Sequence, residues 1–257
     1  MSLPRPLLIA ILFALETCLA TASARSEDAV AGHPLVDVVE SGKVRISNIE
    51  KRIQDYSCKL TKRERVGGEL LGHEIIYCRV RHNPYSVYLY FLAPEERKGQ
   101  QAVYVEGQND DKLLALPVGV AGRLGVYTLK PDGFLAMQGQ RYPITETGFL
   151  NLARRLIEVG EKETTNPNTK VRIYKNAKVD GRPCTVTEVV NAERGSGDIP
   201  YHKARIFVDD ELDIPVRFES YDWPAEEGGE PLLLEEYTYT DIKLNPNFKD
   251  SDFEIRQ

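Results

Sequence analysis

The central part of the chain, residues 56–116, repeats the alternation of side chains that is typical of β-strands. Compact turns separate five such segments, which we predict to be strands at 56–66, 70–81, 86–92, 101–106 and 112–116. A crossover between parallel strands needs about a dozen residues or more, and none of these turns is that long. The sequence therefore predicts an antiparallel meander, in which each strand pairs with the next.

The segment at 86–92 is unusual because it is apolar on both sides. Successive residues of a strand point to opposite faces, and both sets are hydrophobic here: Val87, Leu89 and Phe91 on one face, and Tyr88, Tyr90 and Leu92 on the other. Residues 102–105 repeat the pattern. A sheet with one hydrated face alternates apolar and polar residues, so we expect other parts of the chain to cover both faces of these strands.

Two helices and a second group of strands complete the predicted fold. Apolar residues recur at helical spacing over residues 34–54 and again over 146–159. Further strands, separated by turns that contain Gly and Asp, are predicted at 171–174, 185–190, 204–208, 216–221 and 232–242. We therefore expect an α+β protein, in which amphipathic helices pack against a long antiparallel sheet.

The N-terminus carries the features of an export signal. Arg5 precedes an apolar run at Leu7–Leu15, and Ala22-Ser23-Ala24 supplies the small residues that signal peptidase requires. The alternative is an uncleaved anchor, but the run is shorter than the roughly 20 residues that span a bilayer. We therefore expect residues 1–24 to be a signal peptide. Residues 25–257 would form a single periplasmic or secreted domain that is not an integral membrane protein.

The net charge of −6 argues against nucleic acid as a partner. Binding to phosphates requires clustered Lys and Arg residues, and the densest basic stretch is Lys62-Arg63-Glu64-Arg65. We interpret this stretch as a solvated strand end before a turn. Acidic pairs occur at Glu95-Glu96, Asp110-Asp111, Asp209-Asp210, Glu226-Glu227 and Glu235-Glu236. Most of them lie in predicted turns, so we expect these pairs to be solvated rather than catalytic.

No reactive constellation is recognisable in the sequence. It contains neither a G-x-S-x-G nucleophile elbow, nor an H-E-x-x-H metal motif, nor a phosphate-binding glycine loop. The best candidate for a metal group is His73, Cys78 and His82. Residues 73 and 78 differ by an odd number, however, so a regular strand would point them to opposite faces. We therefore expect no enzymatic activity, no metal site and no cofactor.

Cys58 and Cys78 lie in two predicted strands that flank Gly67-Gly68, a hairpin signal. A three-residue loop that pairs Val66 with Leu70 would place the two cysteines opposite each other. A two-residue loop would instead point them to opposite faces. In the first register, the oxidising space reached by export would permit a cross-strand disulfide. The alternative is two buried, reduced thiols.

Several motifs resemble a known bacterial family. They are Ser86-Val-Tyr-Leu-Tyr-Phe-Leu-Ala-Pro94, then Lys98-Gly-Gln-Gln-Ala-Val-Tyr-Val-Glu-Gly107-Gln-Asn109 with Lys112-Leu113, and Arg141-Tyr-Pro-Ile-Thr145 leading into Gly148 and Leu152. These residues look like the family called domain of unknown function 1571, and the resemblance extends from about residue 35 to Phe253. The family has no assigned activity, so the resemblance transfers no catalytic residue.

The resemblance implies a fold similar to that of the periplasmic lipoprotein carriers, the LolA-like half-barrels. In those proteins a curved antiparallel sheet wraps two or three helices, and lipid lies between them. Related envelope stress regulators share this fold and bind protein partners instead. Fold alone does not determine function, so both kinds of partner stay open at this point.

Our first hypothesis is a binding or carrier protein for a lipid or acylated ligand, such as an acylated lipoprotein, in an apolar groove. Its expected lining is Val87, Leu89, Phe91, Val103, Val105, Phe149 and Leu156. The alternation alone leaves open which face of the strands looks inward. The alternative hypothesis is an envelope module that binds a protein partner or acts as a sensor, with the loops at 193–200 and 223–231 as contact sites.

Overall fold

The structure is a computed structural model that describes residues 32–192, 201–226 and 228–256. Its framework is an antiparallel sheet. The strands within these residues are β1 (Asp55–Val66), β2 (Glu69–Leu70), β3 (Glu74–His82), β4 (Tyr85–Ala93), β5 (Gln101–Val105), β6 (Leu113–Leu116), β7 (Tyr127–Leu129), β8 (Thr169–Val179), β9 (Arg182–Asn191), β10 (Lys203–Asp209), β11 (Pro215–Asp222) and β12 (Leu232–Leu244). The helices of the same part are α1 (Leu35–Arg52), α2 (Gly119–Gly122) and α3 (Phe149–Glu163). The expected signal peptide and the expected contact loop 193–200 lie outside the described residues.

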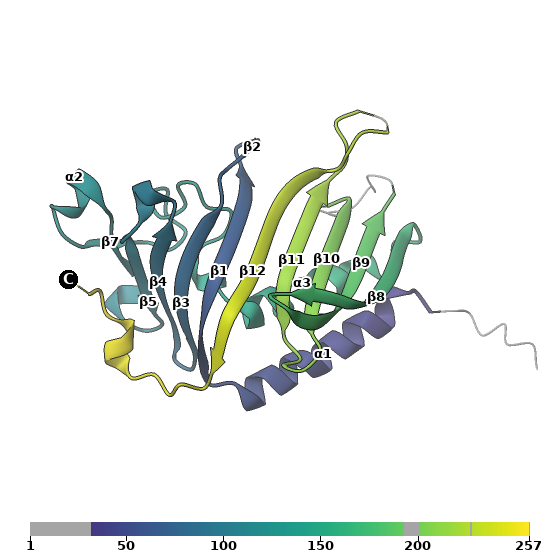
Figure 1. The fold of residues 1–257 in the computed structure, drawn as a ribbon, viewed down its shortest axis with the longest axis horizontal. Helices are drawn as coiled ribbons and strands as arrows, with labels where there is room; N and C mark the ends of the chain where they lie inside the picture. The colour runs from purple at the N-terminus through teal and green to yellow at the C-terminus, as the bar shows by residue number, and fades with distance from the viewer. Residues whose placement is uncertain (1–31, 193–200, 227, 257) are drawn as a thin grey trace, which may run out of the picture. The chain divides into compact units, whose positions relative to one another are not determined.

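The strands cross the sheet in the order β7-β6-β5-β4-β3-β1-β12-β11-β10-β9-β8, and β2 pairs with β1 (Figure 1). Two meanders, one on each side, therefore meet where β1 pairs with β12. The outermost strands, β7 and β8, are not neighbours, so the sheet stays open. The predicted fold class, α+β with a long antiparallel sheet that covers helices, is confirmed.

Both predicted helices are present, with one changed boundary. α1 agrees closely with the predicted span, whereas α3 begins at Phe149 rather than at residue 146. Residues Ile144–Glu146 form a separate 3-10 turn. The chain then turns at Gly148, whose φ of 107° is left-handed and favours glycine. α1 and α3 pack together, and Ile49 and Phe149 are fully buried in the core that they share with the sheet.

The two-sided apolar character of β4 has a structural explanation. Val87 and Phe91 belong to the main core under the helices. Tyr88, on the other face, packs in a second cluster with Phe253 of the C-terminal turn η4 (Asp250–Phe253). Arg79 of β3 holds this turn against the sheet, because its Nη1 donates a hydrogen bond of 2.9 Å to the backbone oxygen of Asp252. The C-terminal segment thus covers the second face of the sheet at β4 and β5.

The hairpin between β1 and β3 places Cys58 directly opposite Cys78. The turn itself differs from the expected one, because Val66 pairs with Glu69 across a two-residue loop. The pairing then shifts by one residue between β2 and β3, which restores the register that brings the cysteines together. Both cysteines are buried free thiols in this structure.

The two ends of the sheet are short or irregular. β7 has three residues. β8 is longer, but its pairing with β9 shifts between Tyr174 and Ala177, where Asn176 has a positive φ. Most of the β8 side chains are exposed, and four of them are basic: Lys170, Arg172, Lys175 and Lys178.

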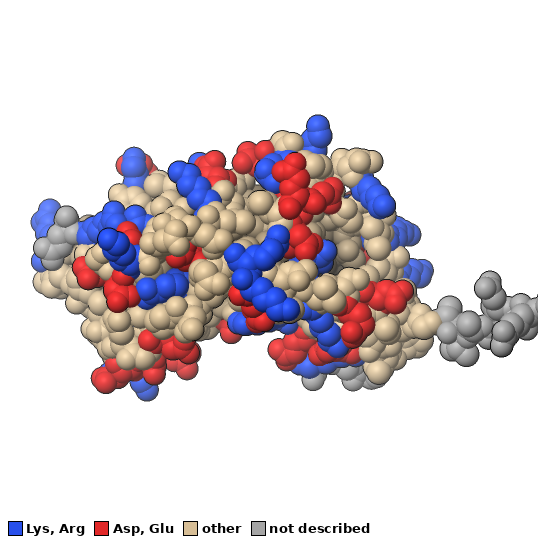
Figure 2. Space-filling view, turned by 90° about the horizontal axis from the view of Figure 1, so that it is seen from below, with Lys and Arg blue, Asp and Glu red and all other residues tan. Residues whose placement is uncertain are grey.

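The molecular surface carries both signs of charge. On the face in Figure 2, acidic and basic side chains are interspersed rather than separated into large areas of one sign. Such a distribution is typical of a solvated surface. In the part of the chain that the structure describes, no helix is long and apolar enough to span a membrane.

We predict that Gly148→Ala destabilises the fold by about 2–4 kcal/mol. The added methyl group would collide with the hydroxyl of the buried Tyr56, which accepts a hydrogen bond of 3.1 Å from the backbone N–H of Phe149. The left-handed backbone adds to the cost. Urea unfolding of both proteins measures the difference. Gly72→Ala is the control, because a methyl group there meets no atom within 4 Å and Gly72 has no positive φ. Similar losses in the two variants would contradict the prediction.

Candidate functional site

A cavity of about 800 Å³ lies between the sheet and the helices α1 and α3. Most of its lining is apolar. The apolar part comes from both helices and from strands across the sheet, and it includes Leu35, Val38, Leu60, Ile76, Leu89, Phe91, Leu156, Val189, Ile206 and Phe218. Strand alternation explains this composition, because one side chain in two on each strand faces the helices.

Three of the residues expected to line a groove do line the cavity: Leu89, Phe91 and Leu156. Two others, Val87 and Phe149, lie in the surrounding core without forming part of the lining. Phe149 is fully buried and stacks on Tyr56 with ring centroids 4.0 Å apart. These five residues therefore belong to the same side of the sheet.

Val103 and Val105 were expected to line the same groove, and this placement is wrong. The β4–β5 pairing puts Leu89 opposite Ala102 and Tyr88 opposite Val103. The odd-numbered residues of β5 consequently share the second face with Tyr88, and both valines pack in the cluster that contains Phe253. Ala102 takes the position on the cavity side.

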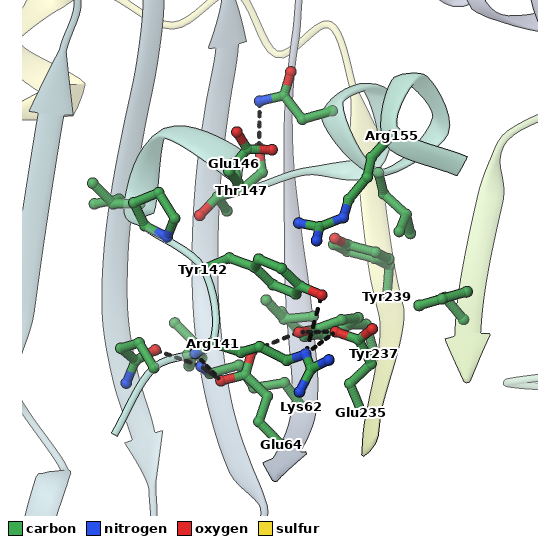
Figure 3. A pocket seen from close by; sticks show the side chains of 18 of the residues that line it. Lys62, Glu64, Arg141, Tyr142, Glu146, Thr147, Arg155, Glu235, Tyr237 and Tyr239 are labelled. Carbon is green, nitrogen blue, oxygen red and sulfur yellow. Dashed lines mark hydrogen bonds and ion pairs between the residues drawn. The ribbon is translucent and has the colours of Figure 1, made fainter. Parts of the chain in front are cut away.

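One region of the cavity is strongly polar. We call it the polar cluster, and it consists of Lys62, Glu64, Glu74, Arg97, Arg141, Tyr142, Glu235 and Tyr237. Figure 3 labels most of its members. Its residues come from β1, β3, β12 and the loops before β5 and α3. Lys62, Glu64 and Glu235 are buried, so these charges are largely removed from water.

Ion pairs connect the charged members of the polar cluster. The Nζ of Lys62 lies 3.1 Å from Glu64 Oε2 and 3.3 Å from Glu74 Oε2, and Arg97 also pairs with Glu74. Arg141 Nε lies 3.4 Å from Glu235 Oε2. A buried charge is stable only with a partner. The three cations and three carboxylates of the cluster therefore neutralise one another.

Hydrogen bonds tie the cluster to the loop that crosses it. The backbone N–H of Arg141 donates to Glu64 Oε2 at 3.0 Å. The hydroxyl of Tyr237 lies 2.6 Å from Glu64 Oε1, and that of Ser220 donates to Glu235 at 2.9 Å. Burial lowers the pKa of Lys62, while the neighbouring carboxylate of Glu64 opposes that shift. Burial, together with the carboxylates of Glu235 and Glu64, raises the pKa of Tyr237 far above its ordinary value.

The ring of Tyr142 lies between two guanidinium groups (Figure 3). The Cζ of Arg155 is 3.7 Å from the ring centroid, and that of Arg141 is 5.8 Å away. A cation over an aromatic face is attracted by the ring quadrupole. Arg155 lies on the cavity wall. Its charge also helps to lower the pKa of Glu158, but among the described residues no carboxylate forms an ion pair with it within 4.0 Å.

The polar cluster was not predicted from the sequence. The sequence predicts a solvated strand end for the stretch from Lys62 to Arg65, and solvated positions for the acidic pair Glu235-Glu236. Both interpretations are wrong for the residues that face inward, because β1 and β12 continue through them. The missed signal is the alternation itself, since Lys62 and Glu64 follow Tyr56, Cys58 and Leu60 at intervals of two.

The candidate metal group does not come together. Cys78 is buried in the core, and His73 pairs instead with Glu236, with its Nε2 3.0 Å from a carboxylate oxygen. The Nδ1 of His82 lies 2.8 Å from the backbone oxygen of Ile53. No group of three or more His, Cys, Asp or Glu residues among the described ones is arranged to hold a metal ion.

Comparison with known proteins identifies one family and several similar folds. The family described as "Protein of unknown function (DUF1571)" matches residues 53–257. No curated protein matches the chain in sequence. The lipoprotein LppX of Mycobacterium tuberculosis is 13% identical with a TM-score of 0.45, over 83% of this chain and 98% of that chain.

Two further solved structures are similar. An uncharacterized conserved protein of Thermus thermophilus is 10% identical with a TM-score of 0.45, over 83% of this chain and 92% of the other. A LolA superfamily protein of Nitrosomonas europaea is 11% identical with a TM-score of 0.33, over 83% and 97%. At such low identity, the similarity concerns the chain fold and says nothing about ligands.

We predict that Lys62→Met destabilises the protein by about 3 kcal/mol. The substitution keeps the approximate length of the side chain. It removes the cation that pairs with Glu64, and it leaves Arg97 as the remaining ion-pair partner of Glu74, in a buried site. Lys59→Met is the matched control on the same strand, because Lys59 points outward and pairs with Asp241 where both are exposed. Urea unfolding should show little change in the control, and equal midpoints for the two variants would refute the prediction.

We also predict that stability declines between about pH 10 and pH 12 because buried tyrosines resist ionisation. Burial and the nearby carboxylate of Glu235 raise the pKa of Tyr142 to about 12, from an ordinary 10.0. Below pH 10 the hydroxyl is neutral in both states. Above it, the unfolded chain ionises first, so folding loses free energy as pH rises toward the folded pKa. Unfolding midpoints over this range test the slope, which Tyr142→Phe should make shallower. An unchanged slope in that variant would show that Tyr142 contributes nothing.

Proposed function

The chain belongs to the DUF1571 family of proteins of unknown function, and we propose that it binds or carries a lipid or another acylated ligand in the cavity beneath its sheet. The observation that supports this proposal is the size and composition of that cavity, about 800 Å³ with a mainly apolar lining. Ligand pockets typically measure about 300–1,000 Å³. Protein interiors otherwise contain few voids larger than a water molecule, so a space of this size is suited to an occupant.

Small side chains at key positions keep the space open. Ala102 of β5, Ala115 of β6 and Ala204 of β10 lie on the cavity wall, where larger residues would reach toward the helices. The exposed apolar wall provides the driving force for binding. Each methylene group of a chain that leaves water for such a wall gains about 0.8 kcal/mol. An alkyl chain of ordinary length therefore provides enough free energy for stable retention.

The polar cluster suits a ligand that has a polar group at one end. An acyl chain would follow the apolar wall, and its headgroup would lie near Arg141, Tyr142 and Arg155. These side chains offer hydrogen-bond donors, and Arg155 offers a cation that has no carboxylate partner within 4.0 Å among the described residues. A carboxylate or phosphate headgroup would match this chemistry.

We further propose that the protein acts in the periplasm or outside the cell, by binding rather than by catalysis. The export features at residues 1–24 support the location. The polar cluster supports the second point, because its charged groups are engaged with one another rather than poised as a nucleophile and its base.

The test is to purify the exported chain without detergent and to extract it for lipid mass spectrometry, beside two variants. Ala115→Trp places an indole inside the cavity. Thr128→Trp adds the same group to the neighbouring strand β7, at an exposed position outside the lining. We expect an acyl species at about one equivalent in the wild type and in Thr128→Trp, and at least about a tenfold loss in Ala115→Trp.

A folded wild-type protein that carries no acyl species, and takes up none when offered a fluorescent fatty acid, would refute the lipid-binding role. The alternative would then lead, namely an envelope module that binds a protein partner. Equal retention by the two Trp variants would show that ligand binds elsewhere.

A further inference from the structure

Exposed apolar side chains gather in one short segment of the chain. Five of the eleven large hydrophobic residues that are exposed in the described part lie within residues 120–135. We call them the apolar tip, and they are Val120, Leu124, Val126, Phe134 and Leu135. Three of them are almost fully exposed: Val120 at 77%, Leu124 at 80% and Phe134 at 83%. Single exposed apolar residues are normal, but a contiguous group marks an interaction site.

The apolar tip belongs to one end of the sheet. It includes the short helix α2, the residue before β7, and the loop after the turn at Lys130–Gly133. In Figure 1, α2 stands beyond β7 at the edge of the sheet. The strand β7 has a neighbour on one side, β6, so nothing in the described chain continues the sheet over these side chains.

The same segment also forms part of the cavity wall. Ala121, Tyr127 and Leu129 line the cavity, and Leu135 belongs both to the lining and to the apolar tip. Leu135 therefore links the exposed tip with the interior. A hydrocarbon chain that left the cavity along this path would stay in contact with apolar side chains.

The charges beside the tip are mainly positive. Arg123 and Lys130 are exposed on this segment, and Asp132 is its one acidic residue between positions 119 and 135. The segment thus carries two cations and one anion in a chain whose net charge is −6. Apolar side chains with adjacent basic residues are the combination that binds at the surface of anionic membranes. In a symmetric dimer, the same segment of a second copy would bring its own Arg123 and Lys130 against these cations, and the like charges would repel.

We propose that the apolar tip docks on an anionic lipid surface, so that the cavity exchanges its ligand with the membrane at this end. The inference rests in part on the proposed function, because only a cavity that binds lipid needs an apolar route along which its ligand can reach the bilayer without entering water. Val120, Leu124 and Phe134 enter the outer layer of the membrane, while Arg123 and Lys130 contact headgroup phosphates. Docking needs no change of fold, since the side chains are already exposed.

The experiment is flotation of the purified exported chain, stripped of lipid, with two kinds of vesicle. One is phosphatidylcholine alone, and the other is phosphatidylcholine with phosphatidylglycerol. The test variant carries both Leu124→Glu and Phe134→Glu. The matched control is Ile173→Glu on β8, at the opposite end of the sheet, where the side chain is 57% exposed. Because all three substituted side chains are exposed, each variant should keep the fold, which circular dichroism checks.

We expect the wild type and Ile173→Glu to float with the phosphatidylglycerol vesicles, and the double variant to lose at least about tenfold in affinity. Arg123→Ser with Lys130→Ser should weaken binding to these vesicles at low salt and have little effect at high salt, where screening removes the same attraction. Equal flotation of the double variant and the wild type would overturn the proposal. So would a wild type that binds neither vesicle. A wild-type dimer that the double variant abolishes, without vesicle binding, would assign the tip to a second copy.

Lipid mass spectrometry on the same preparations, before stripping, separates this inference from the proposed function. Retained acyl ligand without vesicle binding would reject the docking surface alone. Vesicle binding by a chain that never retains an acyl ligand would reject the carrier role and leave the tip as a membrane contact.

Discussion

The pairing of β1 with β12 is the constraint on which the rest of the structure depends. Each meander is built from strands that are neighbours in sequence, whereas this one ladder joins residues near the two ends of the described chain. Without this ladder the strands would form two separate sheets, and no continuous sheet would face the helices. Such a contact carries a large loop-closure cost, so the two meanders would form before the ladder that joins them. The cavity forms only when β1 has paired with β12.

The polar cluster lies where β1 pairs with β12. Glu64 of β1 is directly opposite Glu235 of β12, and like charges in that position repel. The neighbouring pair, Lys62 with Tyr237, supplies the cation and the hydroxyl that offset this repulsion, and Arg141 adds a second cation from the loop. Buried ion pairs add little net stability compared with apolar residues. Their retention here fits a role in fixing the register of β1 against β12 and in holding the crossing loop over the cavity.

Much of the fold follows from residue patterns, but several features of the site do not. Alternation over 86–92 correctly indicated a strand covered on both faces, yet it gave no sign that the cover on one face is the C-terminal turn around Phe253. That contact spans most of the chain, and no local pattern encodes it. The face of β5 was likewise undetermined, because Val103 and Tyr104 are both hydrophobic and only the register with β4 decides between them. The burial of Lys62 and Glu64 does not follow from the sequence, because charged residues usually mark solvent-exposed positions, and several of the groups that pair with them lie in distant segments.

The irregular ends of the sheet also have a consequence for the behaviour of the protein in a crowded compartment. An open sheet presents unpaired backbone groups at both outer strands, and such edges recruit strands from other chains. β7 is too short to template a long ladder, and β8 interrupts its own edge with the shifted register near Asn176 and with a row of basic side chains. The sheet can therefore remain open, as a ligand-sized interior requires, without acting as a seed for aggregation.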